Sequence, residues 1–169
     1  DADADVTNEI QDLELNGNIL TITNNSNATD IDISSSNTSP SYTIGLNPSL
    51  GGYVFYVTPN GKHGLVAETQ DIDNVGFYEA KNQISIPANH TTAGKNFTDW
   101  RLPTIYELGL MYNQRQNIGG FINTKYWSST DNKSSDPTYD GPYLYDFFDN
   151  TQKNASYTLS IRARAVRSF

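Results

Sequence analysis

The 169-residue sequence contains no cysteine. Disulfide bonds, metal sites built from thiolates and cysteine nucleophiles are therefore excluded, and rigidity must come from other interactions. Histidine is scarce as well, with two residues, and methionine occurs once. No apolar run approaches the ~18 residues that a membrane-spanning helix needs, so we expect no membrane insertion.

Basic residues are also few, since 11 Lys and Arg stand against 19 Asp and Glu and give a net charge of −8. Binding to nucleic acid needs a clustered basic surface, so we expect no nucleic-acid partner. The basic residues gather only in Arg162, Arg164 and Arg167. Their alternation with Ala163 and Ala165 is typical of a β-strand, which favours a structural role for these arginines.

The composition changes near residue 40. Residues 1–40 are rich in Asp, Asn, Ser and Thr, whereas the aromatic residues and most glycines follow residue 41. The small polar stretch at residues 34–41, which contains Pro40, is typical of a linker. We therefore predict a β-rich stalk at residues 1–40 and a binding head at residues 41–169. Because the chain starts at Asp1 without a signal-peptide pattern, we expect a fragment or a processed product.

In the predicted stalk, aliphatic residues alternate with polar ones as in short β-strands. Three strands are expected, with Leu13 and Leu15 in the first, Leu20 and Ile22 in the second, and Ile31 and Ile33 in the third. Asn16-Gly17 is typical of a two-residue turn between the first two strands.

So few aliphatic side chains cannot bury a core of their own, and their common face needs another surface. Two arrangements remain open: a homotrimer in which copies of the segment wrap around a threefold axis, or a hairpin arm on a monomer. We favour the homotrimer, because trimer formation also pairs the exposed strand edges.

The first residues offer a weak metal site. Asp1, Asp3 and Asp5 are spaced like the first ligands of a calcium-binding loop. Val6 stands where such a loop needs glycine, and the flanking helices are missing from the pattern. We therefore favour a solvated acidic segment without a cofactor, with Ca²⁺ as the alternative.

The predicted head opens with a hairpin and contains one well-marked helix. Residues 51–57 and 63–67 are β-prone and flank a turn at residues 59–61. Thr104 and Glu107 form a capping-box pattern, which predicts a helix that begins at Thr104 and ends between residues 113 and 116. Its buried face is expected to contain Ile105, Leu108, Met111 and Tyr112.

Three segments of the head carry a recognisable pattern: Asp-Trp-Arg-Leu-Pro-Thr at residues 99–104, Tyr-Trp-Ser-Ser at 126–129 and Arg-Ala-Val-Arg-Ser-Phe at 164–169. Together with Gly-Gly-Tyr-Val-Phe at 51–55, they resemble the Lcl C-terminal-like domain of collagen-like bacterial adhesins, a member of the C-type-lectin-like fold group. The resemblance covers about residues 44–169. It implies an α+β fold with short strands and one well-defined helix, and a binding function rather than catalysis.

Within this pattern, Trp100 and Trp127 are expected in the core, and Asp99 with Arg101 as a local pair. The segment between Trp127 and Ile161 is loop-like and rich in Tyr, Asn, Asp and Ser, which are suited to contacting sugars or proteins. We predict ligand binding by Asp131, Asn132, Asp136, Tyr139, Asp140, Tyr143 and Tyr145, and an ordinary polar surface is the alternative. The tripeptides of calcium-dependent sugar lectins are absent, so calcium-bridged sugar binding is not expected.

Catalysis has little support in the sequence. His63 and His90 lack metal-spaced partners or a nucleophile motif, and both are expected on the surface. Carboxylates such as Glu68 with Asp71 or Asp73 fit a glycosidase pair, but their abundance makes any such pair unspecific.

The sequence thus favours a non-enzymatic receptor-binding head of a trimeric phage fibre or spike on the virion surface, which attaches to a bacterial glycan or protein. The alternatives are a bacterial surface adhesin module that binds host or matrix glycans, and a purely structural fibre or capsid tip.

Overall fold

The computed structural model describes residues 13–23, 27, 29–33, 40–132 and 141–169. Contacts divide the chain into two compact units, Asp1–Pro40 and Ser41–Phe169. The division falls where the composition changes. Both units contain β-strands, and the helices lie in the second, so the fold is of mixed α and β type.

The first unit is a three-stranded antiparallel sheet in the order β1-β2-β3. The strands are β1 (Leu13–Asn16), β2 (Ile19–Ile22) and β3 (Ile31–Asp32). The three strands were expected, but the turn lies one residue later than predicted. Asn16 pairs with Ile19, so Gly17 and Asn18 form the turn. Gly17 has φ 63°, which a residue without a side chain adopts at little cost.

The second unit is built on a seven-stranded sheet in the order β4-β5-β6-β10-β7-β8-β9. All neighbours are antiparallel except β10 and β7, which run parallel. The predicted hairpin is confirmed as β5 and β6. The strands are β4 (Gly45–Asn47), β5 (Gly52–Val57), β6 (Gly64–Val75), β7 (Lys125–Asn132), β8 (Gly141–Asp146), β9 (Thr151–Asn154) and β10 (Ile161–Ser168).

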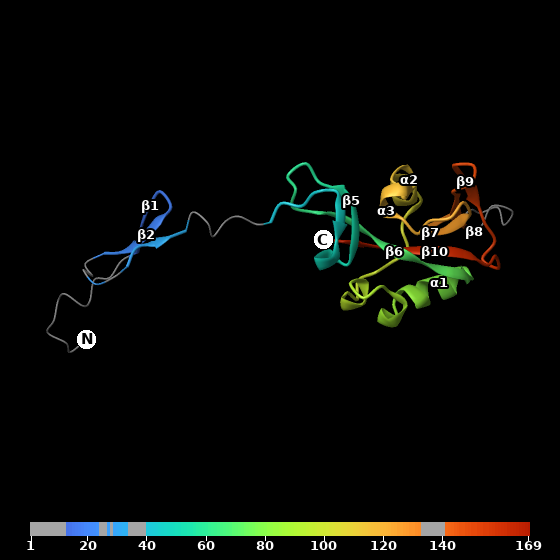
Figure 1. Cartoon of the computed structure of the whole chain (residues 1–169), viewed down its shortest axis with the longest axis horizontal. Helices are drawn as coiled ribbons and strands as arrows, with labels where there is room; N and C mark the ends of the chain where they lie inside the picture. Colours follow the sequence, from blue (N-terminus) through green and yellow to red (C-terminus); the bar gives the residue numbers. More distant parts are fainter. Residues whose placement is uncertain (1–12, 24–26, 28, 34–39, 133–140) are drawn as a thin grey trace. The chain divides into compact units, whose positions relative to one another are not determined.

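Helices cover both faces of this sheet, with α1 on one side and α2 and α3 on the other (Figure 1). They are α1 (Phe77–Ile84), α2 (Ile105–Asn113) and α3 (Arg115–Ile118), and short 3₁₀ turns occur at η1 (Pro48–Leu50), η2 (Pro87–Asn89) and η3 (Gly94–Asn96). None of the helices in the described part of the chain combines the length and the apolar character that crossing a membrane requires.

Helix α2 confirms the predicted helix. The Thr104 hydroxyl accepts from the Glu107 backbone N–H, and the Glu107 carboxylate accepts from the Thr104 backbone N–H, which completes the capping box. Leu108 and Met111 are buried, as expected. The prediction of one helix was wrong, however, because α1 and α3 also form.

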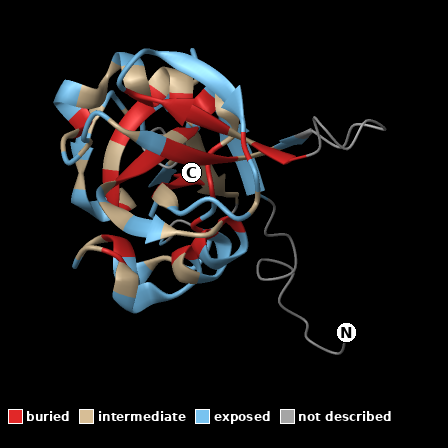
Figure 2. Ribbon diagram, turned by 90° about the vertical axis from the view of Figure 1, so that its right-hand side faces the viewer, coloured by how far each residue is buried: buried red, intermediate tan, exposed pale blue. Residues whose placement is uncertain are grey.

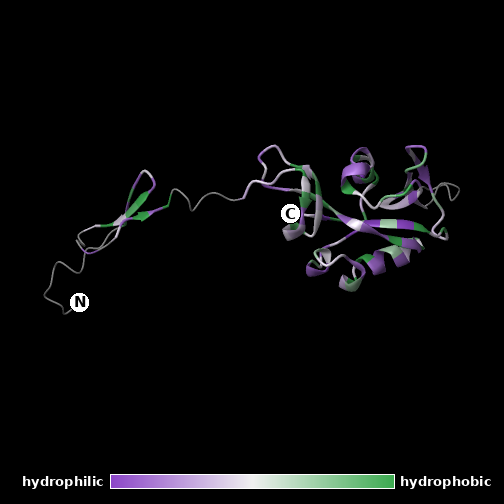
Figure 3. Ribbon diagram, viewed as in Figure 1, coloured by the Kyte–Doolittle hydropathy of each residue, from purple (hydrophilic) through white to green (hydrophobic). Residues whose placement is uncertain are grey.

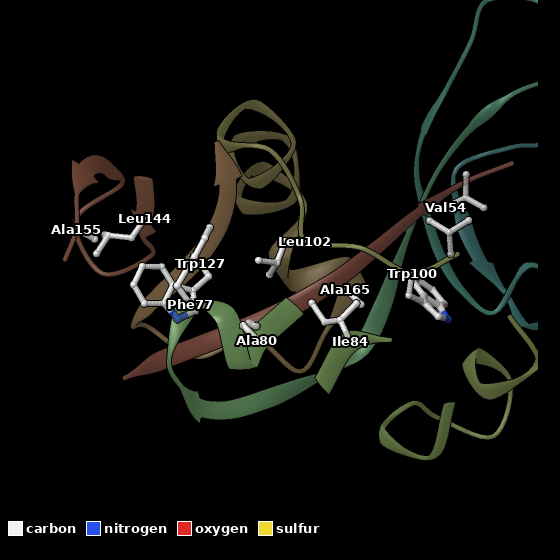
Figure 4. Packing of buried hydrophobic residues seen from close by; sticks show 12 residues of the cluster. Val54, Phe77, Ala80, Ile84, Trp100, Leu102, Trp127, Leu144, Ala155 and Ala165 are labelled. Carbon is white, nitrogen blue, oxygen red and sulfur yellow. The ribbon is translucent and has the colours of Figure 1, made fainter. Parts of the chain in front are cut away.

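Side chains of each central strand point alternately to the two faces of the sheet and form two cores. The α1 side contains Phe77, Ala80, Ile84, Trp100, Trp127 and Ala165, among others. The α2 side contains Phe55, Leu108, Met111, Tyr126, Phe147 and Val166, among others. Figure 2 shows this buried interior beneath an exposed surface, and Figure 4 shows Phe77 of α1 against Trp127. The core positions predicted for Trp100 and Trp127 are confirmed.

The three segments with the recognisable pattern contact one another. Arg101 and Val166 exchange two backbone hydrogen bonds of 2.9 Å, which join residues 99–104 to β10. The Ser129 N–H donates to the Pro103 carbonyl at 2.7 Å, which joins the same segment to β7. Residues far apart in the sequence thereby build one scaffold.

The predicted pair of Asp99 with Arg101 was wrong. Arg101 instead makes a two-pronged ion pair with Glu107, with N–O distances of 2.8 and 2.7 Å. Asp99 accepts from Arg167 Nε at 2.8 Å. The backbone hydrogen bonds between Arg101 and Val166 explain why Asp99 pairs with Arg167, because they bring β10 beside residue 99.

Arg164 lies in the middle of β10, and its side chain is 0% exposed. Its Nε donates to Asp71 Oδ1 at 2.6 Å, and its Nη1 donates to the carbonyls of Glu68 and Gly119 at 2.8 and 3.1 Å. The guanidinium also lies 3.8 Å from the ring centre of Phe121. The predicted structural role of this arginine is confirmed.

Replacing Arg164 by Met should lower the free energy of unfolding by about 3–5 kcal/mol, because Asp71 would keep a buried charge without its main cation. Arg162→Met is the matched control, since Arg162 is partly exposed and contacts the same carboxylate at 3.2 Å. Its cost should stay near 1 kcal/mol. Urea unfolding followed by tryptophan fluorescence measures both. Equal stability of the two variants would contradict this account.

Candidate functional site

The predicted ligand-binding residues that the structure describes lie on β7 and β8. Asp131 is exposed near the end of β7, and its carboxylate accepts from the Tyr157 hydroxyl at 2.8 and 3.0 Å. Asn132, the last residue of β7, pairs with Gly141, the first residue of β8. Asp136, Tyr139 and Asp140 lie outside the described residues, as do the possible calcium ligands Asp1, Asp3 and Asp5.

Tyr143 and Tyr145 differ from each other. Tyr143 is half-buried in β8, where its carbonyl accepts from the Ser128 hydroxyl at 2.7 Å. Tyr145 is buried on the α2 side, stacks on Tyr112 and donates to Asn150 Oδ1 at 2.7 Å. Its predicted role as a ligand contact is therefore corrected to core packing.

A pair of tyrosines, of which Tyr78 is exposed and Tyr157 half-buried, lies beside Asp131. The rings of Tyr78, on α1, and Tyr157 are almost parallel, with 5.4 Å between their centres and 10° between their planes. Tyr78 remains 64% exposed. We call this pair the tyrosine stack. It presents an aromatic surface next to a carboxylate, a combination that suits the C–H faces and hydroxyl groups of a sugar.

Sequence reasoning did not find the tyrosine stack. Phe77, Ala80 and Ile84 have the spacing of the buried face of a helix, which places Tyr78 on its outer side. The signal was weak because Gly76 precedes the helix without a side-chain cap.

A pocket of about 240 Å³ opens between α1 and β7, lined by Lys81, Trp100, Arg101, Leu102 and Ser129. We call it the α1–β7 pocket. The buried ring of Phe77 connects it with the tyrosine stack. Lys81 Nζ lies 4.2 Å from the ring centre of Phe77, and both tyrosine rings lie 5.4 Å from it. Lys81 of the pocket and both tyrosines of the stack thus pack against the same buried ring.

A second pocket, of about 260 Å³, lies between β5, β6 and α2 and is lined by Tyr56, Leu65, Thr104, Tyr106, Glu107 and Leu110. The Glu107 carboxylate that lines this pocket already has partners inside the fold, because it pairs with Arg101 and closes the capping box. Fewer polar groups are therefore available to a ligand here than beside the tyrosine stack.

The wall of the α1–β7 pocket is held by a buried pair, Glu68 and His90. Trp100 stacks on His90, with 5.2 Å between the ring centres, and its indole N–H donates to the Gly94 carbonyl. His90 Nε2 lies 2.7 Å from the Ile84 carbonyl, and Nδ1 lies 3.2 Å from Glu68 Oε2. The surface position predicted for His90 was therefore wrong, whereas His63 is exposed as predicted.

These contacts define the proton on His90 Nε2 and the charge of Glu68. A carbonyl oxygen only accepts, so His90 Nε2 carries a proton. Burial acts to raise the pKa of Glu68, but hydrogen bonds from His90, Thr69 and Thr91 lower it below its usual value. Glu68 is therefore a buried carboxylate that its hydrogen-bond partners stabilise.

Carboxylates considered for catalysis have structural partners instead. Glu68 is bound by His90 and Thr91, and Asp71 by Arg164 and by the Tyr126 hydroxyl. Asp73 pairs with Arg162. Among the described ranges, no group of three or more His, Asp or Glu side chains is placed to hold a metal ion.

No protein-family model matches the sequence, and no curated protein matches it either. The likeness of residues 44–169 to the Lcl C-terminal-like domain therefore stays a prediction.

The low pKa of Glu68 predicts an acid-sensitive fold. The unfolded chain takes up this proton at about pH 4.3, and the folded chain only at a lower pH. The contribution of Glu68 to stability is therefore complete above about pH 5 and is lost as the pH falls through its folded pKa. The melting temperature should stay level from pH 7 to 5 and then fall.

Glu68→Gln is the control for this prediction. It should melt at a lower temperature at pH 7 and show a shallower decline in acid. Melting curves recorded from pH 7 to 3 test this prediction. If the melting temperatures of the variant and the natural chain decline in parallel, the prediction is wrong.

Proposed function

We propose that residues 41–169 form a non-catalytic, C-type-lectin-like head that attaches its parent protein to a glycan or protein receptor on a bacterial surface. The observation that carries the proposal is the tyrosine stack beside Asp131, in which Tyr78 is exposed, near the α1–β7 pocket. Exposed aromatic rings beside hydrogen-bonding groups are the chemistry by which proteins bind sugars and many protein surfaces.

The arrangement of the scaffold supports the same proposal. Backbone hydrogen bonds, ion pairs and core packing hold the segments at residues 99–104, 126–129 and 164–169 in place. The α1–β7 pocket is lined by Lys81 of α1 and by Trp100, Arg101, Leu102 and Ser129 of the first two segments, so these contacts hold its wall in place. A binding surface held by a rigid scaffold is what a receptor-binding head requires.

We also propose that the first unit joins copies of the chain into a homotrimer, as in a phage fibre or spike. In an antiparallel sheet, residues directly opposite each other project to the same face. Leu13 is opposite Ile22, Leu15 is opposite Leu20, and Leu20 is opposite Ile31. These five aliphatic side chains therefore share one face, whereas Ile19, opposite Asn16 and Asp32, lies on the reverse face.

This aliphatic face is uncovered within the described residues of the unit. Leu13, Leu15 and Ile31 are 67%, 58% and 54% exposed, and Figure 3 shows the hydrophobic residues on these strands. The reverse face carries Glu14 and Asp32, so copies meet most favourably through their uncharged faces. Three sheets in a ring let each face contact two neighbours, which a single small sheet cannot provide for itself.

Binding through the tyrosine stack is tested with the whole chain on bacterial cells and on a glycan array. Tyr78→Ala should weaken binding about tenfold, the loss expected for one aromatic contact. Tyr157→Phe keeps the ring but removes the hydrogen bond to Asp131, so it should weaken binding less.

The matched control for this test is Tyr106→Ala, on the opposite side of the sheet, where the side chain is also exposed. It should leave binding unchanged. If Tyr106→Ala abolishes binding while Tyr78→Ala does not, the receptor site belongs to the pocket between β5, β6 and α2. Hydrolysis of the polysaccharide by the chain would overturn the non-catalytic assignment.

Trimer formation is measured by light scattering of the purified chain at micromolar concentration. The natural sequence should give three times the chain mass of 18.8 kDa. Leu13→Ser with Leu15→Ser should give monomers, because it removes apolar area from the shared face. Glu14 lies between Leu13 and Leu15 but projects to the reverse face, so the Glu14→Gln variant should remain trimeric. A monomeric natural chain would contradict the proposal.

A further inference from the structure

The charge of the α1–β7 pocket is opposite to that of the chain. Its two ionisable lining residues, Lys81 and Arg101, are both basic, and Ser129 adds a hydroxyl. No carboxylate lines it, although acidic residues outnumber basic ones by 19 to 11 in the sequence. Trp100 and Leu102 supply the apolar part of its wall. A small concave site with convergent polar groups and an apolar wall is the usual form of a ligand subsite.

Arg101 is fixed in place but keeps free donors. Nη1 donates to the Leu102 carbonyl and to Glu107 Oε2, and Nη2 donates to Glu107 Oε1. An arginine side chain has five N–H groups, so two of them have no acceptor in the described part of the chain. The side chain is 42% exposed. Arg101 can therefore hydrogen-bond a ligand while Glu107 balances its charge.

Lys81 supplies the unbalanced charge. Its ammonium lies over the ring of Phe77 and makes no ion pair with any described residue. The ring attracts the cation and positions it, but leaves its charge uncompensated. The pocket therefore has a net positive charge of one, which suits a single anionic group.

The position of Lys81 links this charge to the tyrosine stack. Tyr78 and Lys81 are three residues apart on α1 and hence neighbours on its surface. Both contact the buried ring of Phe77. A sugar ring stacked on Tyr78 would thus have the Lys81 ammonium within reach of a substituent on that ring.

We infer that the α1–β7 pocket binds the carboxylate of an acidic sugar, such as a uronic acid, whose ring or neighbouring ring lies on the tyrosine stack. This inference rests on the proposed binding function and names its ligand class. A polyanion such as a sulfated polymer is a poorer ligand, because the net charge of −8 repels its remaining charges and the pocket neutralises one.

The test is an NMR titration of the whole chain with three probes: sodium glucuronate, methyl glucoside and sodium acetate. Glucuronate should shift the amide resonances of Lys81, Arg101 and Ser129, and should bind about tenfold more tightly than either other probe. The glucoside lacks the carboxylate, and acetate lacks the ring. Raising the salt concentration should weaken glucuronate binding but not glucoside binding.

Lys81→Gln should abolish the preference for glucuronate over the glucoside. Lys125→Gln, which changes an exposed lysine at the start of β7, is the matched control and should preserve it. The inference is overturned if glucuronate binds no more tightly than the glucoside or than acetate. It is also overturned if the preference for glucuronate survives in the Lys81→Gln variant.

The acidic-sugar assignment and the proposed receptor-binding function can fail independently of each other. If Tyr78→Ala abolishes cell binding but glucuronate shifts none of the pocket resonances, the binding head stands and the acidic-sugar assignment fails. If glucuronate binds at the pocket but the chain attaches to no cell or glycan, the subsite stands and the receptor-binding role fails.

Discussion

The buried guanidinium of Arg164 joins the two halves of the seven-stranded sheet. Arg164 lies in β10, the strand that separates β4–β6 from β7–β9, and it contacts Asp71 of β6, the Gly119 carbonyl after α3 and the ring of Phe121. A buried cation needs all its partners at once, because each lost contact leaves charge in an apolar medium. In a chain without disulfides, this cluster defines how the two halves meet, and thereby positions β7 beside α1.

Local patterns in the sequence predicted those parts of the fold that depend on neighbouring residues. The capping box at Thr104 and Glu107, the hairpin of β5 and β6 and the strand pattern of Arg164 are all decided within a few positions. The buried tryptophans also followed from their setting. The turn after β1 was misplaced by one residue, because both Asn16-Gly17 and Gly17-Asn18 suit a tight turn and the pairing of the strands decides between them.

Features that depend on distant residues escaped the sequence analysis. Helix α1 has no side-chain cap, so its existence rests on packing of Phe77 against Trp127, fifty positions away. His90 is buried because its ring nitrogens face Glu68 and the Ile84 carbonyl, which lie on other elements. The candidate site shows the same limit, since Asp131 was predicted from the composition of its segment, whereas Tyr157, which binds Asp131, and Tyr78, which stacks on Tyr157, meet it only through the fold. Tyr145 was misassigned because composition alone does not tell the two faces of β8 apart.

The position of β10 has a consequence for synthesis on the ribosome. This strand follows both of its neighbours in the chain, yet it lies between them in the sheet. While residues 161–168 are still being made, β5 with β6 and β7 with β8 can pair as separate hairpins, but the edges of β6 and β7 that β10 will cover stay open. Such edges attract other strands, so the nascent second unit is most exposed to aggregation before β10 has been added. The contacts closed by β10 span about ninety residues, which makes this joining a slow, late step of folding.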